Sequence, residues 1–244
     1  MTYCVATMID AGLVFASDSR TNAGVDNVST YKKMTVFEKA GDRVITIVNS
    51  GNLSVTQATI AHLNRSIQRG IEPNLMTATS MYEVAELVGE ALREVRQRDA
   101  AFLMQGNVDA GANFIVGGQI AGEAMRLFLV YSEGNFIEAT RETPYFQIGE
   151  TKYGKPIIDR VIQKDTTMMR AVKCVLVSFD STMRSNLSVG LPIDLMCYGR
   201  DQLRVQHCHR FDEADEYMKL LRKLWGEGLN RAFAELPAPD WLAT

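Results

Sequence analysis

Short apolar, β-branched runs separated by turn-forming residues open the chain. Two such runs, at 3–9 and 13–19, flank a separator at 10–12 that ends in glycine. Because glycine tolerates a positive φ angle, this spacing predicts a hairpin with a three-residue loop. A second hairpin is predicted by the runs at 34–38 and 44–48, which flank another glycine-containing turn. The first fifty residues are therefore expected to form antiparallel strand pairs.

Helical periodicity takes over after residue 52. Apolar residues recur every three or four positions, which is typical of amphipathic helices with one buried face. The helices predicted in this way cover 53–69, 78–98, 156–163, 166–183 and 212–235. In the second of them the face opposite the apolar stripe is charged, so we expect it to cover one side of a sheet.

Further strand-like runs lie between these helices. They cover 112–118, 125–131, 136–139, 145–148, 193–198 and 203–209. Helices that are segregated from antiparallel strands favour two stacked sheets with helical layers outside. We therefore predict an α+β fold, a four-layer αββα sandwich of two stacked, mainly antiparallel sheets. It is expected to form one domain, 1–244, with a C-terminal helix and tail at about 212–244.

The end of this tail carries two prolines and an apolar terminus. Leu236-Pro237-Ala238-Pro239-Asp240-Trp241-Leu242 cannot continue a helix through its prolines. We expect it to pack on a core, with a contact between subunits as the second alternative.

Composition and charge narrow the class of protein. The net charge is −3 and the sequence pI is about 5.7, which does not favour nucleic acid or a membrane surface as a partner. The four cysteines have no close-paired spacing and lie in apolar segments, as in a reducing compartment. No apolar stretch of 18 residues occurs. A cytoplasmic location is expected.

The candidate chemistry starts at the second residue. Removal of Met1 would leave Thr2 with a free α-amine, which titrates near pH ~8 and can accept the proton of the Thr2 hydroxyl. A strand starting there would hold both groups rigidly. We expect methionine removal to be the only processing step. If Met1 is retained, the nitrogen of Thr2 is an amide and cannot act as a base.

The predicted hairpin brings a carboxylate toward this threonine. If Ile9 pairs with Leu13, Asp18 lies opposite Cys4 and diagonally across from Thr2, at about 7–8 Å between Cβ atoms. The alternative is that Asp18 simply ends a strand together with the turn-forming residues after it.

Two lysines and a glycine add to this pattern. Lys32 and Lys33 precede a strand, where adjacent lysines are usually solvated edge residues. Alternatively, one of them points inward, pairs with Asp18 and holds the Thr2 amine neutral. Gly51 lies at a strand-to-helix junction, which suits either an oxyanion hole or an ordinary turn.

Three other motifs have competing interpretations. The hydroxyl-rich stretch 180–190 can cap a helix or orient the Thr2 amine. Residues 149–155 match a phosphate-binding loop, but Pro156 replaces the required hydroxyl, so we predict no nucleotide cofactor. His207 and His209 share a strand face without further ligands at a supportive spacing, so we predict no metal.

Together these residues resemble a known superfamily. Thr2, Ala16-Ser17-Asp18, Lys32-Lys33 and the Gly51 junction are similar to proteasome β-subunits and HslV, which are N-terminal nucleophile (Ntn) hydrolases. The stretch 178–190 resembles most closely the bacterial ancestral β-subunit (Anbu) group. The resemblance covers essentially the whole chain up to its C-terminal helix, and it implies the Ntn-hydrolase fold.

The resemblance also implies roles for residues. Thr2 matches the nucleophile, Asp18 and Lys33 match the family aspartate and lysine, and Gly51 falls at the oxyanion hole to within about one residue.

Supporting positions depart from the family pattern. Ser185 is the best match for the serine that assists the amine. Thr182 stands where an aspartate is expected, so Asp180 or Ser181 is expected to substitute. Glu150 stands where the family has the serine of Gly-Ser-Gly.

The function that the resemblance implies is a threonine-type peptidase that cleaves polypeptides inside a homo-oligomeric ring or ring-like spiral. The departures at Glu150 and Thr182 motivate a rival from another class, a non-catalytic assembly protein with the same fold. A third alternative is an Ntn hydrolase that acts on a small amide. The sequence identifies no unfoldase or other partner.

Overall fold

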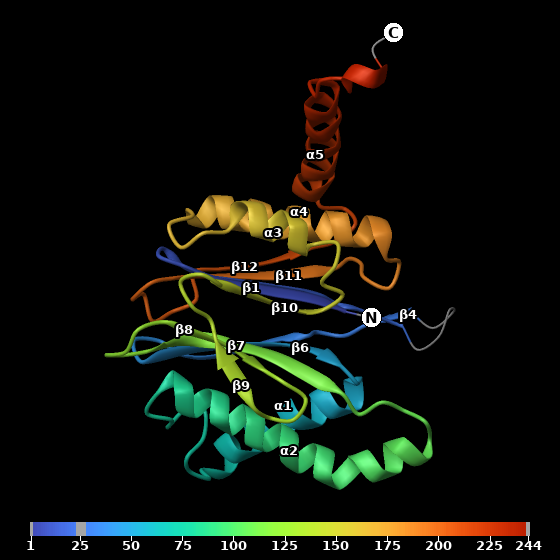
Figure 1. Ribbon diagram of the computed structural model, residues 1–244. Helices are drawn as coiled ribbons and strands as arrows, with labels where there is room; N and C mark the ends of the chain where they lie inside the picture. Colours follow the sequence, from blue (N-terminus) through green and yellow to red (C-terminus); the bar gives the residue numbers. More distant parts are fainter. Residues whose placement is uncertain (1, 23–27, 243–244) are drawn as a thin grey trace.

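Two β-sheets stacked face to face form the centre of the molecule, with helices on both outer sides (Figure 1). The structure is a computed structural model that describes residues 2–22 and 28–242. The order of layers is helix, sheet, sheet, helix, so the predicted α+β, αββα sandwich is confirmed.

The first sheet carries the start of the chain at its centre. Its strand order is β10-β1-β2-β11-β12, and all neighbours are antiparallel. The strands are β1 (Tyr3–Ile9), β2 (Gly12–Asp18), β10 (Tyr145–Gly149), β11 (Ile193–Gly199) and β12 (His207–Phe211). β1 and β2 are buried along their whole length, which explains their continuous apolar character.

The second sheet is built from consecutive strands, in the order β5-β6-β7-β8-β9. These strands are β5 (Met34–Lys39), β6 (Arg43–Gly51), β7 (Ala112–Ile120), β8 (Arg126–Val130) and β9 (Phe136–Glu138). A separate two-stranded ribbon, β3 (Arg20–Asn22) with β4 (Val28–Thr30), leads from the first sheet toward the second.

Three apolar cores hold the layers together. Helices α1 (Leu53–Arg69) and α2 (Met81–Gln105) pack on the second sheet, and α3 (Lys155–Val161) and α4 (Met168–Ser185) pack on the first. A third core, with Phe15 and Tyr198 among its largest members, fills the space between the sheets. Burial of these faces is the main stabilising term.

The first hairpin differs from its predicted register by one residue. Ile9 pairs with Gly12 and Cys4 with Ser17, so the loop has two residues and not three. Gly12 belongs to the strand, where a Cβ atom would lie 1.9 Å from the carbonyl oxygen of Tyr198. Glycine serves a close approach of strands here and not the loop itself.

Several element boundaries also differ from the prediction. Ser80 caps α2, which runs on to Gln105 because its last residues, although exposed, are good helix formers. Asp215, and not Asp212, caps the last helix. The strand predicted at 203–209 begins only at His207.

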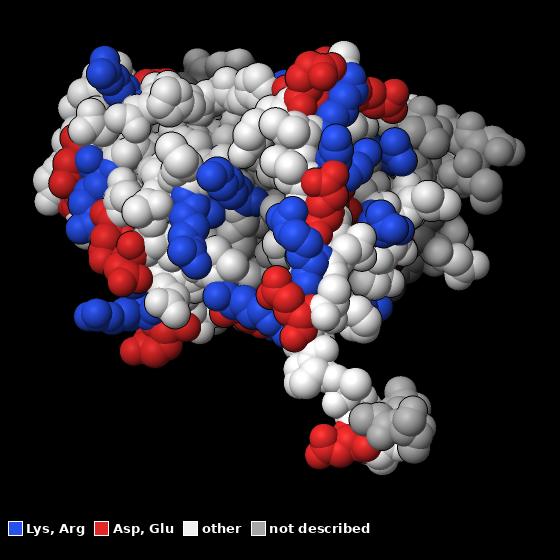
Figure 2. Space-filling model, turned by 90° about the horizontal axis from the view of Figure 1, so that it is seen from above, with Lys and Arg blue, Asp and Glu red and all other residues white. Residues whose placement is uncertain are grey.

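The last helix, α5 (Glu216–Ala234), stands away from the four layers (Figure 1). Only Met218 and Leu221 are buried in it, against α4. The tail is exposed as well, with Trp241 at 79% exposure, so the expectation that it packs on a core of this chain is wrong. Seen from above, basic and acidic side chains lie beside one another on this end of the molecule (Figure 2).

Candidate active site

Thr2 is held by backbone contacts with the end of β10 and the residue that follows it. Its carbonyl oxygen accepts a hydrogen bond of 2.7 Å from the backbone N–H of Glu150. Gly149 has a φ of 84°, and a Cβ atom there would lie only 1.9 Å from the same carbonyl oxygen. A side chain at position 149 would therefore displace Thr2, so glycine is needed there for both its backbone angle and its size.

Asp18 and Lys33 form a buried ion pair next to Thr2. The Lys33 Nζ lies 2.8 Å from Asp18 Oδ1 and also donates to the carbonyl oxygen of Arg20 at 2.6 Å. Asp18 Oδ1 accepts the backbone N–H of Tyr3 at 3.1 Å. Of the two alternatives for the lysine pair, the structure shows the one in which one lysine points inward and pairs with Asp18. That lysine is Lys33, whereas Lys32 is exposed.

The environment of this pair is strongly desolvated. Asp18 is fully buried and Lys33 is 4% exposed. Burial raises the pKa of the Asp18 carboxyl above its ordinary value, and the Lys33 ammonium and the Tyr3 N–H oppose that rise. Burial also raises the pKa of the Cys4 thiol, which donates to the carbonyl oxygen of Asn49. Cys4 is therefore a neutral thiol near Thr2 and is not itself a nucleophile.

A cavity of about 730 Å³ opens beside Thr2, and Gly51 and Asp109 line its wall. Gly51 ends β6 with a φ of 108°, and a Cβ atom there would lie 2.3 Å from the carbonyl oxygen of Gly111. The structure thus brings the predicted oxyanion residue and the predicted nucleophile to one cavity.

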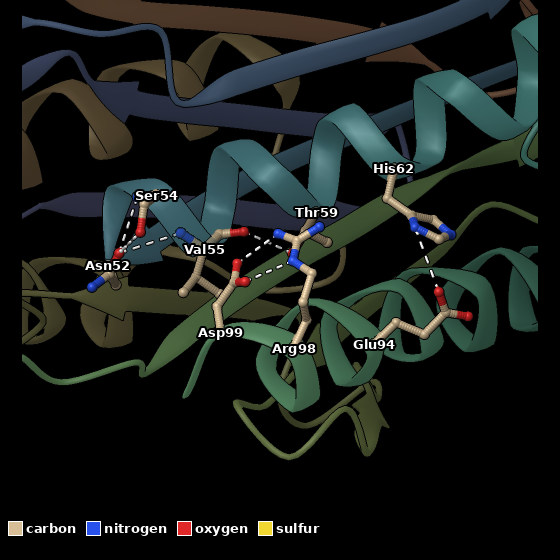
Figure 3. A network of polar contacts seen from close by, with 8 residues as sticks. All are labelled: Asn52, Ser54, Val55, Thr59, His62, Glu94, Arg98 and Asp99. Atoms are coloured by element: carbon tan, nitrogen blue, oxygen red, sulfur yellow. Dashed lines mark hydrogen bonds and ion pairs between the residues drawn. The ribbon is translucent and has the colours of Figure 1, made fainter. Parts of the chain in front are cut away.

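The wall next to Gly51 is the start of α1. Asn52 caps this helix, with its side-chain oxygen accepting the backbone N–H groups of Ser54 and Val55. Figure 3 shows this cap and the polar contacts that follow along α1 and α2, where His62 Nδ1 lies 3.6 Å from a Glu94 carboxylate oxygen. The cap fixes where the helix begins and hence the position of the Gly51 backbone.

The supporting residues are placed differently from one another. Glu150 is 7% exposed, and its Oε2 accepts a hydrogen bond of 2.9 Å from Asn186 Nδ2. Ser185 is the last residue of α4 and is exposed, and Ser181 is half-buried on the same helix. Asp180 forms an ion pair of 2.7 Å with Arg222 of α5. Of these four predicted residues, the contacts place Glu150 beside Thr2 and direct Asp180 toward α5.

Two further residues belong to this environment. Asn186 follows Ser185 directly and contacts Glu150. It lies within the stretch 180–190, but nothing in the sequence distinguishes it from an ordinary residue at a helix end. Tyr3 is the first residue of β1. Its hydroxyl contacts Ser178 of α4 at 3.0 Å and Gln147 of β10, and burial raises its pKa. Tyr3 therefore anchors the strand that carries Thr2, and only its adjacency to Thr2 could have indicated this role.

The other motifs serve local structure. In the stretch that matches a phosphate-binding loop, Lys155 forms an ion pair with Asp159, and Gly149 contacts Thr2. His209 lies 3.1 Å from Asp215 on the exposed strand β12. Among the described side chains, no group of three or more His, Cys, Asp or Glu is placed to hold a metal ion. Within residues 2–22 and 28–242, no helix has the length and apolar character needed to cross a membrane.

Solved structures of high similarity exist. The chain is 50% identical to Anbu (ancestral beta-subunit) from Yersinia bercovieri, with a TM-score of 0.92 and coverage of 98% of this chain and 99% of that one. It is 45% identical to the protein in the helical assembly of the Anbu complex from Pseudomonas aeruginosa, with a TM-score of 0.94 and coverage of 99% and 100%. An Anbu (Gly-1) mutant from Hyphomicrobium sp. strain MC1 is 48% identical, with a TM-score of 0.91 and coverage of 98% and 100%.

Comparison with protein-family models and with curated proteins gave no match. The two stacked sheets, with a threonine at the head of a central strand, are those of a proteasome-like subunit of the Ntn type. The chain belongs to the Anbu (ancestral β-subunit) family.

Proposed function

We propose that this protein is a threonine-type peptidase that uses Thr2 as its N-terminal nucleophile. One observation carries the proposal: Asp18 of the buried Lys33–Asp18 pair accepts a hydrogen bond from the N–H of Tyr3, the residue directly after Thr2. A buried charge pair is costly to desolvate, and removal of one partner leaves an uncompensated charge. Its position at the head of β1 supports a catalytic role.

The reaction follows from these groups. After Met1 is removed, the neutral α-amine of Thr2 takes the hydroxyl proton while the oxygen attacks the scissile carbonyl carbon. The tetrahedral intermediate collapses, the proton passes to the leaving amine, and an ester to Thr2 remains. Water, deprotonated by the same amine, then hydrolyses that ester and regenerates the hydroxyl.

The neighbouring residues act on charge. The Lys33 ammonium disfavours protonation of the nearby α-amine and stabilises the developing alkoxide, while Asp18 holds the lysine in place. The backbone at Gly51 is proposed to bind the oxyanion, since the glycine lines the same cavity as Thr2.

Polypeptide is the proposed substrate. The cavity beside Thr2 has a volume of about 730 Å³, which suits a ligand larger than a simple amide. Most of its lining residues are glycines or carry a hydroxyl group, and among these described residues Asp109 is the one with a charged side chain. Such a wall favours an extended peptide held through its backbone.

A homo-oligomer, ring or ring-like spiral, is the proposed state of assembly. The exposed apolar side chains of α5 include Leu220, Leu224, Leu229 and Phe233, at 50–78% exposure. Leu220 and Leu224 lie on one side of the helix, and Leu229 and Phe233 lie on the opposite side further along it. Exposed apolar side chains in this number are typical of a subunit contact. The relative from Pseudomonas aeruginosa is described as a helical assembly. The four free cysteines fit a cytoplasmic location.

Turnover of a fluorogenic peptide library by the processed wild type, compared with Thr2→Ala, tests the peptidase proposal. Wild-type cleavage that is lost in Thr2→Ala supports it. A processed and assembled chain that cleaves nothing would favour the assembly protein. Cleavage restricted to one small amide would favour the third alternative and exclude polypeptide as the substrate.

A further inference from the structure

Glu150 is a buried carboxylate that the reaction outlined above does not use. It is 7% exposed, and among the described residues no cationic side chain forms an ion pair with it. Its known side-chain partner is the neutral amide of Asn186, at 2.9 Å. A buried carboxylate without a cation is unfavourable, because the amide offsets only part of the lost hydration.

A backbone hydrogen bond holds Glu150 against Thr2 where the pairing of β1 with β10 ends. The last paired residues are Tyr3 and Gly149, and Gly149 has a φ of 84°, so Glu150 lies just beyond the regular strand. The Glu150 N–H donates a hydrogen bond of 2.7 Å to the Thr2 carbonyl oxygen. This bond fixes the Glu150 backbone next to that of Thr2, at a distance that a glutamate side chain can span to the Thr2 α-nitrogen.

The other charged side chains at this end of the sheets have partners other than Glu150. Lys33 is already bonded to Asp18 and to the Arg20 carbonyl oxygen. The Arg20 guanidinium donates to the carbonyl oxygen of Leu187. Asp109 lies on the far wall of the cavity and accepts the N–H of Gly111. None of these charged side chains bonds to Glu150, whereas the α-ammonium of processed Thr2 would be a cation next to it.

We propose that Glu150, positioned by Asn186, forms an ion pair with the α-ammonium of Thr2 and thereby sets the pH range in which the amine is a free base. This inference rests on the proposed N-terminal nucleophile. Glu150 acts through the amine, so it is a positioning residue. It opposes Lys33: the carboxylate favours the protonated amine, and the lysine favours the neutral one.

The experiment measures the pKa of the Thr2 amine itself. Chain with a free Thr2 amine, verified by intact mass, is acylated with trace acetic anhydride at a series of pH values, and the N-terminal peptide is quantified by mass spectrometry. Glu150→Gln is expected to lower the amine pKa by about one unit or more, because it removes an opposite charge at close range. Glu150→Asp, which keeps the charge, is expected to restore at least part of the shift.

Glu142→Gln is the matched control, since Glu142 is an exposed acid on the loop that precedes β10. Its amine pKa is expected to equal that of the wild type. An unchanged amine pKa in folded Glu150→Gln would overturn the ion pair. If that variant does not fold, a crystal structure of processed wild type decides: an α-nitrogen within about 4 Å of a Glu150 carboxylate oxygen supports the pair, and a longer separation rejects it.

The amine titration does not depend on turnover. A shifted amine in a chain that cleaves no peptide would refute the proposed function and leave the ion pair standing. In an active enzyme, the acidic limb of the pH–rate profile is expected to move toward lower pH in Glu150→Gln by the same amount as the amine pKa.

Discussion

The Thr2 end of the sandwich and helix α5 differ in which side chains they bury and expose. At Thr2, charged side chains are buried and paired, as in the contact of Lys33 with Asp18. On α5, apolar side chains such as Leu224 and Phe233 are exposed to 51% and 78%. In the first region the charges are paired within one chain, whereas the second exposes apolar side chains that one chain does not cover. The difference fits the proposal that each subunit carries its own catalytic residues and that α5 makes the contact between subunits.

The largest effect is expected from removing the buried cation, Lys33. Lys33→Ala is expected to reduce peptide turnover by a factor on the order of 10³ and the free energy of unfolding by about 3–5 kcal/mol, because Asp18 is left buried and unpaired. Kinetics and denaturant unfolding measure both effects. The adjacent exposed Lys32→Ala is the control and should change neither. Equal effects from the two lysines would show that the buried pair has no special role.

The opposite region is tested by placing charge on its apolar face. Leu220 and Leu224 lie one helical turn apart and are about half exposed. The double variant Leu220→Glu, Leu224→Glu is expected to dissociate the oligomer, as measured by light scattering, while the monomer's free energy of unfolding changes by less than about 0.5 kcal/mol. Lys223→Gln, an exposed change on the same helix, should leave the mass unaltered. Intact oligomers in the double variant would mean that α5 is not the subunit contact.

The fit of Thr2 against β10 gives a smaller but sharper test. Gly149→Ala places a Cβ atom against the Thr2 carbonyl oxygen, so turnover is expected to fall on the order of 10²-fold and stability by about 1–3 kcal/mol. Gly41→Ala has a similar φ, of 80°, but nothing within 4 Å of the added Cβ atom. It should lose stability only. A Gly149→Ala enzyme that is as active as Gly41→Ala would show that Thr2 tolerates displacement.

The smallest expected effect is the difference in labelling rate between buried and exposed cysteines. Burial raises the pKa of Cys174 to about 12 and that of Cys197 to about 11. A pH of 8 is far below both values, so both side chains remain thiols. Cys208 lies on the exposed edge strand. Iodoacetamide at pH 8 is expected to label Cys208 first, with the buried thiols slower on the order of 10²-fold. Peptide mapping over time measures the order, and faster labelling of Cys4 would mean that the Thr2 region opens.

Periodicity in the sequence predicted the layers well, because burial on one face leaves a clear pattern of apolar positions. The hairpin register was missed by one residue, since the role of Gly12 depends on Tyr198, almost two hundred positions later. The end of α2 was also missed, because residues 100–104 are all apolar in sequence and so show no single buried face, although Ala100 and Leu103 pack on the core while Phe102 and Met104 are exposed.

At the site, the inward lysine could be selected from the resemblance but not from Lys32-Lys33 alone, since both are equally polar in sequence. Asn186 and the Arg222–Asp180 pair could not be inferred from local pattern, because their partners lie on elements far along the chain. Contacts of this kind depend on tertiary packing, which sequence periodicity does not encode.

The most direct test of the central claim is the intact mass of the protein after incubation with a peptide epoxyketone. This reagent requires both the free amine and the hydroxyl of an N-terminal threonine. The predicted result is loss of Met1 and addition of one inhibitor molecule, with no addition to Thr2→Ala. A processed wild-type chain that stays unmodified under conditions that saturate an active proteasome would contradict a competent nucleophile at Thr2.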